Sequence, residues 1–270
     1  MSRTDADETL GFDPQRRFGG VVRLYGTAGL ARFNAARVAV VGIGGVGTWA
    51  AEALARTGVG HLTLIDLDHV TESNTNRQIH ALDDQFGMAK VLAMARRIDA
   101  IHPGAQVRTV EEFVTPQNAA GLLKGVDLVI DCVDQVAAKV AMACAARASA
   151  CTLIMCGGAG GRRDPGRIRH GDLARSGGDA LLASVRQRLR RDHGYPARGS
   201  GAQAPPFGIL AVYSDEALQP APACPPEAAP GSPLACGGYG SAVTVTATMG
   251  FAAAACALEH ILRGPLPPAA

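Results

Sequence analysis

The segment 37–56 constrains the fold of this chain more than any other. It opens with the apolar run RVAVV, continues with the spacing G-x-G-x-x-G at Gly42, Gly44 and Gly47, and ends in an Ala-rich stretch. This order is typical of a buried parallel strand that enters a tight turn and then a helix. The glycines let backbone N–H groups and the helix N-terminus approach a phosphate. The segment therefore predicts a nucleotide-binding turn, but it does not distinguish NAD from ATP.

Strand and helix patterns alternate along the first 156 residues. Further strands are predicted at 62–66, 106–110, 126–132 and 151–155, and helices at 12–34, 89–99, 116–123 and 137–148. Such alternation favours a parallel sheet with right-handed crossovers, which is a Rossmann-like, doubly wound α/β fold. Beyond Gly157 the patterns predict additional C-terminal elements, namely a helix at 180–191, a strand at 209–213 and a helix within 241–258.

The chain length of 270 residues fits a single domain. We expect residues 14–156 to form its nucleotide-binding part and 157–264 its substrate and dimer part. The Pro-, Ala- and Gly-rich stretches at 196–206 and 217–235 are predicted to be flexible loops. The net charge of +2 is too small to indicate nucleic-acid binding by itself.

The compartment is predicted from the cysteines and from one uncharged segment. Seven cysteines, an odd number, together with a polar N-terminus favour a reducing cytoplasm. Residues 241–258 carry no charge and are about long enough to cross a bilayer, but they contain Thr, Ser and Gly. We therefore expect a buried core or dimer helix there, and membrane association is not favoured.

Polar residues beyond the glycine turn favour ATP over NAD. Asp66 ends the second predicted strand, where an acid can bond ribose hydroxyls. A dehydrogenase has no need for the Asn74, Arg77 and Lys90 that follow, whereas a triphosphate does. Asp134 follows the fourth strand on the ligand side of the sheet, where a carboxylate beside phosphates is a natural Mg²⁺ ligand.

The run D-x-D-x-V-x-x-S-N-x-x-R-Q at 66–78, with the glycine motif before it and G-x-x-K at 87–90 after it, resembles the ubiquitin-activating-type adenylating superfamily, also called ThiF-type. The resemblance implies an ATP-dependent enzyme, a homodimer, and a role for each matching residue. The implied nucleotide-binding set is Gly42, Gly44, Gly45, Gly47, Asp66, Asp68, Asn74, Arg77, Gln78 and Lys90.

The resemblance also implies catalytic roles for Arg77, Lys90, Asp134 as the Mg²⁺ ligand, and Arg17, which would reach the ATP of the partner subunit. The alternative for Arg17 is a solvated helix charge.

Further motifs resemble one branch of the superfamily, the tRNA threonylcarbamoyladenosine dehydratases. They are Arg17-Phe-Gly-Gly, Arg23-Leu-Tyr-Gly, Thr75-Asn-Arg-Gln-Ile-His, Gly157-Gly-Ala-Gly-Gly and Cys236-Gly-Gly-Tyr-Gly. The C-x-x-C pairs that sulfur-carrier activators usually hold are missing from the sequence. The branch implies tRNA bearing threonylcarbamoyladenosine as substrate, whose carboxylate is adenylated with release of pyrophosphate before the ring closes.

Other interpretations remain open at this point. The chain could instead activate the C-terminus of a ubiquitin-like or sulfur-carrier protein, or serve as a nucleotide-binding adaptor for a sulfur-transfer partner such as a cysteine desulfurase or its sulfur acceptor. Cys236 could take an activated group or be a structural thiol. The arginines within 162–192 could contact tRNA phosphates or form a solvated face.

Overall fold

The computed structural model describes residues 12–197, 205–219 and 239–264. Both loops predicted from composition lie largely outside these ranges. Seven strands form one sheet in the order β3-β2-β1-β4-β5-β7-β6. All neighbours are parallel except β6 and β7, which are antiparallel. The predicted Rossmann-like, doubly wound fold is confirmed.

The strands closely follow the predicted apolar runs. They are β1 (Arg37–Val41), β2 (His61–Ile65), β3 (Gln106–Val110), β4 (Leu128–Asp131), β5 (Thr152–Cys156), β6 (Ile168–Asp172) and β7 (Leu210–Ser214). Strand β6 was not predicted, because its sequence IRHGD is polar and half-exposed. It is held at the sheet edge by its pairing with β7.

The helices also match the predicted segments, with shifted ends. They are α1 (Pro14–Ala35), α2 (Gly47–Arg56), α3 (Lys90–Ile101), α4 (Ala119–Leu122), α5 (Val136–Ser149), α6 (Ala180–Asp192) and α7 (Val243–Arg263). Helix α1 is kinked at Gly26, whose φ is +75°. Asp13 and Asp179 cap α1 and α6 by accepting hydrogen bonds from backbone N–H groups of their first turns.

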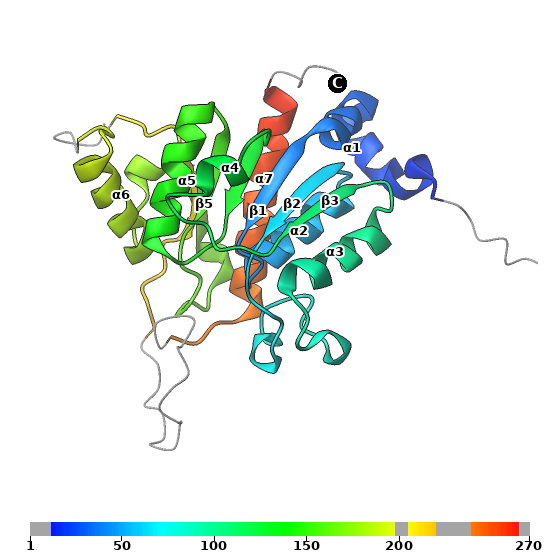
Figure 1. The fold of residues 1–270 in the computed structure, drawn as a ribbon, viewed down its shortest axis with the longest axis horizontal. Coiled ribbons are helices and arrows are strands. Elements are labelled where there is room, and N and C mark those ends of the chain that lie inside the picture. The colour runs from blue at the N-terminus through cyan, green and yellow to red at the C-terminus, as the bar shows by residue number, and fades with distance from the viewer. Residues whose placement is uncertain (1–11, 198–204, 220–238, 265–270) are drawn as a thin grey trace, which may run out of the picture.

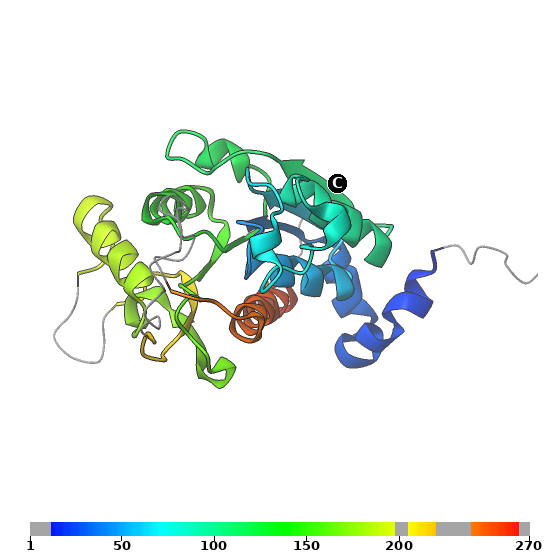
Figure 2. The ribbon, with the colours of Figure 1, turned by 90° about the horizontal axis from the view of Figure 1, so that it is seen from below.

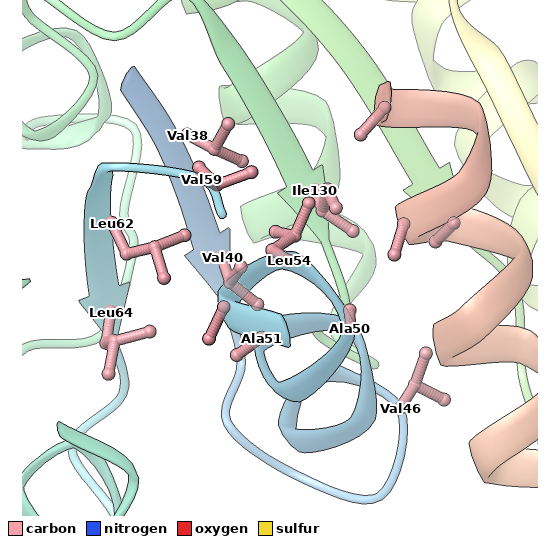
Figure 3. Close-up of a cluster of buried hydrophobic side chains, with 14 of the residues drawn as sticks. Val38, Val40, Val46, Ala50, Ala51, Leu54, Val59, Leu62, Leu64 and Ile130 are labelled. Atoms are coloured by element: carbon pink, nitrogen blue, oxygen red, sulfur yellow. The ribbon is translucent and has the colours of Figure 1, made fainter. Parts of the chain in front are cut away.

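The two faces of the sheet carry separate hydrophobic cores, as strand alternation requires. Val38 and Val40 of β1 pack with residues of α2, α3 and α7 on one face. Ala39 and Val41 pack with residues of α5 and α6 on the other face. Figure 2 shows α7 and α5 on opposite sides of the strands. The first core is drawn in Figure 3, where Leu54 of α2 points toward Val40 and Ile130.

Helix α7 is long and apolar enough to cross a membrane by length and composition. In the fold it packs along α2 and against β5, with Met249, Ala253 and Ala257 fully buried. A Cβ on Gly250 would lie 2.5 Å from the carbonyl oxygen of Val46, so α7 and α2 approach at backbone distance. The packing of this face agrees with the expected core helix, whereas Val243 and Phe251 lie exposed, and a dimer role for α7 stays a prediction.

Candidate nucleotide site

The glycines between β1 and α2 serve two different purposes. Gly42 has φ +87°, and a Cβ there would lie 2.9 Å from the backbone carbon of Cys132. A Cβ on Gly47 would lie 1.9 Å from the carbonyl oxygen of Gly42. A Cβ on Gly44, by contrast, would meet no atom of the described residues within 4 Å. Packing thus requires Gly42 and Gly47, whereas the space beside Gly44 is open to a ligand at the N-terminus of α2.

Arg77 lies directly against the glycine turn. A Cβ on Gly45 would be 3.2 Å from Cγ of Arg77 and 3.2 Å from Cγ2 of Thr246. The Arg77 Nη1 donates to the carbonyl oxygen of Ser73 and to Oδ1 of Asn76, both at 2.8 Å. Its Nε and Nη2 have no partner among the described residues. The guanidinium is therefore fixed beside the turn with N–H donors left for a phosphate.

Asp66 ties the glycine turn to the end of β2. Its Oδ2 accepts a hydrogen bond from the backbone N of Ile43 at 2.6 Å, and its Oδ1 accepts one from the N of Asp68 at 2.9 Å. Burial raises the pKa of Asp66, and the nearby charge of Lys90 partly offsets this. A carboxylate held in this way keeps lone pairs that can accept from ribose hydroxyls.

Lys90 begins α3 and is paired with Asp68. The Lys90 Nζ lies 2.7 Å from Oδ2 of Asp68. The Lys90 side chain is 8% exposed, whereas that of Asp68 is 55% exposed. The ammonium therefore lies beside an exposed carboxylate after the end of β2, where a phosphate can also contact it.

Two further residues of the predicted set, Asn74 and Gln78, are buried within the loop between β2 and α3. Asn74 ends a short 3₁₀ turn and accepts at Oδ1 from the backbone N of Thr71 at 3.1 Å. Gln78 is 5% exposed, and its Oε1 has no hydrogen-bond partner among the described residues. Asn74 therefore positions the loop that carries Arg77. The side-chain carbonyl of Gln78 is free to accept a hydrogen bond from a ligand or water.

Asp134 is exposed and follows β4, the neighbour of β1. Cys132, two residues earlier, is the residue that packs on Gly42. The described residues contain no cluster of three or more metal-ligating side chains. A single carboxylate fits Mg²⁺ nonetheless, because this ion is usually held by one or two carboxylates together with substrate phosphates and water.

Arg17 is not brought to this site. It donates through Nη1 to the carbonyl oxygens of Ala100 at 3.1 Å and Ile101 at 2.6 Å, at the C-terminal end of α3. Lys90 lies at the other end of that helix, about 15 Å away at 1.5 Å per residue. Cys236 lies outside the described residues.

A buried ion pair beneath the site was not predicted from the sequence. Lys139 of α5 and Asp131 of β4 are fully buried, with Nζ 3.0 Å from Oδ1. The Lys139 Nζ also donates to the carbonyl oxygen of Cys156 at 2.7 Å, which joins the ends of β4 and β5. Burial raises the pKa of Asp131, and the charge of Lys139 opposes that rise. Lys139 is one of three lysines in the chain, and this rarity inside an Ala-rich helix was the available signal.

His80 was missed as well, although it belongs to a quoted motif. It is 2% exposed, and its Nε2 lies 3.3 Å from the carbonyl oxygen of Ile43 in the glycine turn. Burial lowers the pKa of His80 to about 4. The imidazole is therefore neutral at physiological pH and contacts the glycine turn through the Ile43 carbonyl oxygen.

The arginines within 162–192 are largely used inside the protein. Arg162 is buried and donates to the carbonyl oxygens of Ser214 and Gly178. Arg167 and Arg169 both pair with Asp215, at 2.7 and 3.2 Å. Others follow the same pattern: Arg186 donates to Ser176, Arg190 lies over Phe207, and Arg191 pairs with Asp192. This segment offers RNA less charge than its composition indicates.

Comparison with known proteins finds relatives over most of the chain. The model of the ThiF family matches residues 19–264. The chain is 45% identical to tRNA threonylcarbamoyladenosine dehydratase of Escherichia coli, over 92% of this chain and 94% of that protein. It is 38% identical to the dehydratase of the same name from Haemophilus influenzae, with the same coverage.

Solved structures of the E. coli enzyme share the fold. The complex with ATP superposes with a TM-score of 0.81 and the complex with AMP with a TM-score of 0.82, each at 45% identity and over 92% of this chain and 94% of that one. The nucleotide-binding turn, the family match and these relatives lead to one conclusion: the chain belongs to the ThiF family.

Proposed function

We propose that the chain is an ATP-dependent dehydratase that cyclises threonylcarbamoyladenosine in tRNA beside the anticodon. The observation that carries the proposal is the open space at Gly44, with Arg77 against the adjacent Gly45 and Lys90 paired with Asp68 after the next strand, in a chain 45% identical to the E. coli dehydratase. These residues supply N–H donors and positive charge where a triphosphate would lie. Relatives solved with ATP and AMP support the same assignment.

The chemistry follows from the poor reactivity of a carboxylate, whose leaving group would be oxide. The substrate carboxylate attacks the α-phosphate of ATP, which gives an acyl-adenylate and releases pyrophosphate. The ureido nitrogen of the same side chain then attacks the activated carbonyl, the ring closes, and AMP leaves with the carboxylate oxygen. The nucleoside thereby loses one water. Ring closure is intramolecular, so the protein mainly orients groups and stabilises phosphate charge.

Named residues divide this work. The Arg77 guanidinium and the Lys90 ammonium stabilise charge on the phosphates, and Asp66 orients the ribose. Asp134 would hold Mg²⁺ together with phosphate oxygens, and the bound ion would add Lewis-acid stabilisation of the phosphates. Gln78, with its unpartnered buried carbonyl, would accept from the nucleotide or an ordered water.

We further propose a homodimer in which Arg17 serves the partner's site. Its place at the far end of α3 from Lys90 supports action in trans. Mixing an inactive Arg17→Ala chain with an inactive Arg77→Ala chain should restore part of the activity, because some dimers would hold one intact site. Failure of the mixture to recover activity would limit Arg17 to its contact with α3. A sulfur-transfer partner and a role for Cys236 stay predictions, as does the cytoplasmic compartment.

The proposed function is tested by incubating the protein with Mg-ATP and tRNA bearing threonylcarbamoyladenosine. Mass spectrometry of the nucleosides should show loss of one water only when ATP is present. Arg77→Ala and Asp134→Ala should abolish this loss, whereas Arg56→Ala, on the exposed side of α2, should retain it. Unchanged tRNA from a protein that binds ATP would contradict the proposal and point to a carrier protein as substrate.

A further inference from the structure

The second face of the sheet is left open where β1, β2 and β3 begin. Helices α4, α5 and α6 pack over the strands on this side, but in Figure 1 β2 and β3 are seen without a helix in front of them. A cavity of about 450 Å³ opens there. Its polar lining is Arg37 of β1, His61 and Thr63 of β2, Gln106 and Arg108 of β3, and Lys124 from the turn before β4.

This basic cavity, as we name it, carries an excess of positive charge. Arg37, His61, Arg108 and Lys124 have no side-chain hydrogen bond or ion pair among the described residues. Within the part of the chain that the structure describes, no Asp or Glu lines the cavity. Asp127 contacts the lining residue Arg37, with its Oδ2 accepting from the backbone N at 2.8 Å, and its negative charge offsets one of the cationic side chains.

An exposed strand face needs polar residues, but it does not need residues of one sign. Elsewhere in the chain several surface arginines are paired with acids: Arg97 binds Glu52 at 2.6 Å, and Arg167 binds Asp215 at 2.7 Å. Alternate residues of β2 and β3 point into the basic cavity, and the polar ones among them are basic or neutral. Such a surface is complementary to an anion that supplies several charges at once.

We propose that the basic cavity binds phosphates of the tRNA substrate, an inference that rests on the proposed function. The cavity lies at the first residues of strands whose last residues lead into the nucleotide site. Strands of five residues place the two sites about 16 Å apart, at 3.3 Å per residue. A stem-loop RNA extends beyond this span, so one tRNA can reach both sites. Proteins grip RNA stems largely through phosphates and 2′-hydroxyls, which suits Arg, Lys and Gln side chains.

The test measures tRNA affinity against salt concentration for wild type and charge variants. Arg108→Ala and Lys124→Ala each remove one exposed charge from the cavity. Arg96→Ala is the matched control, because Arg96 is exposed on α3 over the opposite face and has no partner among the described residues. Each cavity variant should weaken binding several-fold and lower the slope of log K against log salt by about 1.

Turnover separates this inference from the proposed function. The cavity variants should raise KM for tRNA with ATP affinity and kcat unchanged, and Arg96→Ala should match wild type throughout. If the wild-type protein neither binds nor dehydrates tRNA, the proposed function fails and this inference with it. If wild type does both, and Arg108→Ala and Lys124→Ala match it in affinity and salt slope, the inference alone is overturned.

Discussion

Replacing Lys139 by Met should destabilise the protein through the carboxylate it leaves behind. Both members of the Lys139–Asp131 pair are fully buried, and Nζ lies 3.0 Å from Oδ1. Oδ2 of Asp131 already has no partner among the described residues. Removing one partner of a buried pair costs about 3–5 kcal/mol, because a charge remains in a medium that solvates it poorly.

The same number follows from protonation. Without Lys139, Asp131 can become neutral by binding a proton, and the ordinary pKa of the carboxyl group is 3.8. Near pH 7 this costs about 4 kcal/mol, and near pH 5.5 about 2 kcal/mol, at 1.36 kcal/mol per pH unit. Since burial raises the pKa of the folded carboxyl, the variant binds more protons folded than unfolded. Its stability must therefore fall as pH rises above the unfolded pKa.

Urea unfolding of wild type and Lys139→Met near both pH values checks the reasoning. The free-energy loss should be larger near pH 7 than near pH 5.5 by about 2 kcal/mol. The double variant Asp131→Asn/Lys139→Met removes both charges and keeps an acceptor for the N of Val133, so it should lose far less than Lys139→Met alone. A loss below about 1 kcal/mol for Lys139→Met, or one that does not shrink at lower pH, would refute the argument.

Two further predictions concern the glycine turn. Gly47→Ala places a Cβ 1.9 Å from the carbonyl oxygen of Gly42, so it should disrupt the turn and lower Tm. The Cβ of Gly44→Ala meets no described atom within 4 Å, so this variant should keep the wild-type Tm but bind ATP more weakly. Equal Tm values for the two variants in thermal scans would contradict this contrast. Burial holds the pKa of His80 at about 4, below its ordinary 6.5, so this group contributes full stability above pH 6.5 and about 3 kcal/mol is lost as pH falls to 4. His80→Gln should remove that part of the acid sensitivity in pH-dependent urea unfolding, and an unchanged pH profile would count against the assignment.

Local pattern was enough to predict most of the sheet. The apolar run at 37–41 became a strand with the same bounds, because buried parallel strands read as continuous apolar stretches. The segment 106–110, QVRTV, also became a strand with the predicted bounds, although it lies at the sheet edge and is only partly buried. Strand β6 escaped prediction because IRHGD has no such run, and only its antiparallel pairing with β7, some 40 residues away, makes it a strand. Pairing of that kind is not encoded in a local window.

The structure brings several of the predicted site residues together, but their local contacts could not be predicted from the sequence. The motif identified Gly44 and Gly47 together, yet only the fold shows that one position faces open space and the other faces a carbonyl oxygen. Asn74 was expected to bind phosphate, and the structure gives it a hydrogen bond within its own loop. The Lys139–Asp131 pair was missed because its members look like single charges in apolar segments until β4 and α5 are packed together.

The position of basic residues in the sequence does not predict where positive charge is exposed on the folded protein. Most of the arginines that cluster along 162–192 have partners within the protein, and some of these partners are distant in the sequence, such as Asp215, 48 residues beyond Arg167. The basic cavity differs from this segment, because Arg37, Arg108 and Lys124 are widely separated in the chain and do not form a basic run in the sequence. Three parallel strands set side by side bring these residues to one surface, and no acid lines it. An excess of charge that matters to a polyanion is thus a property of the folded surface, and the salt dependence of tRNA binding should follow the cavity rather than the Arg-rich run.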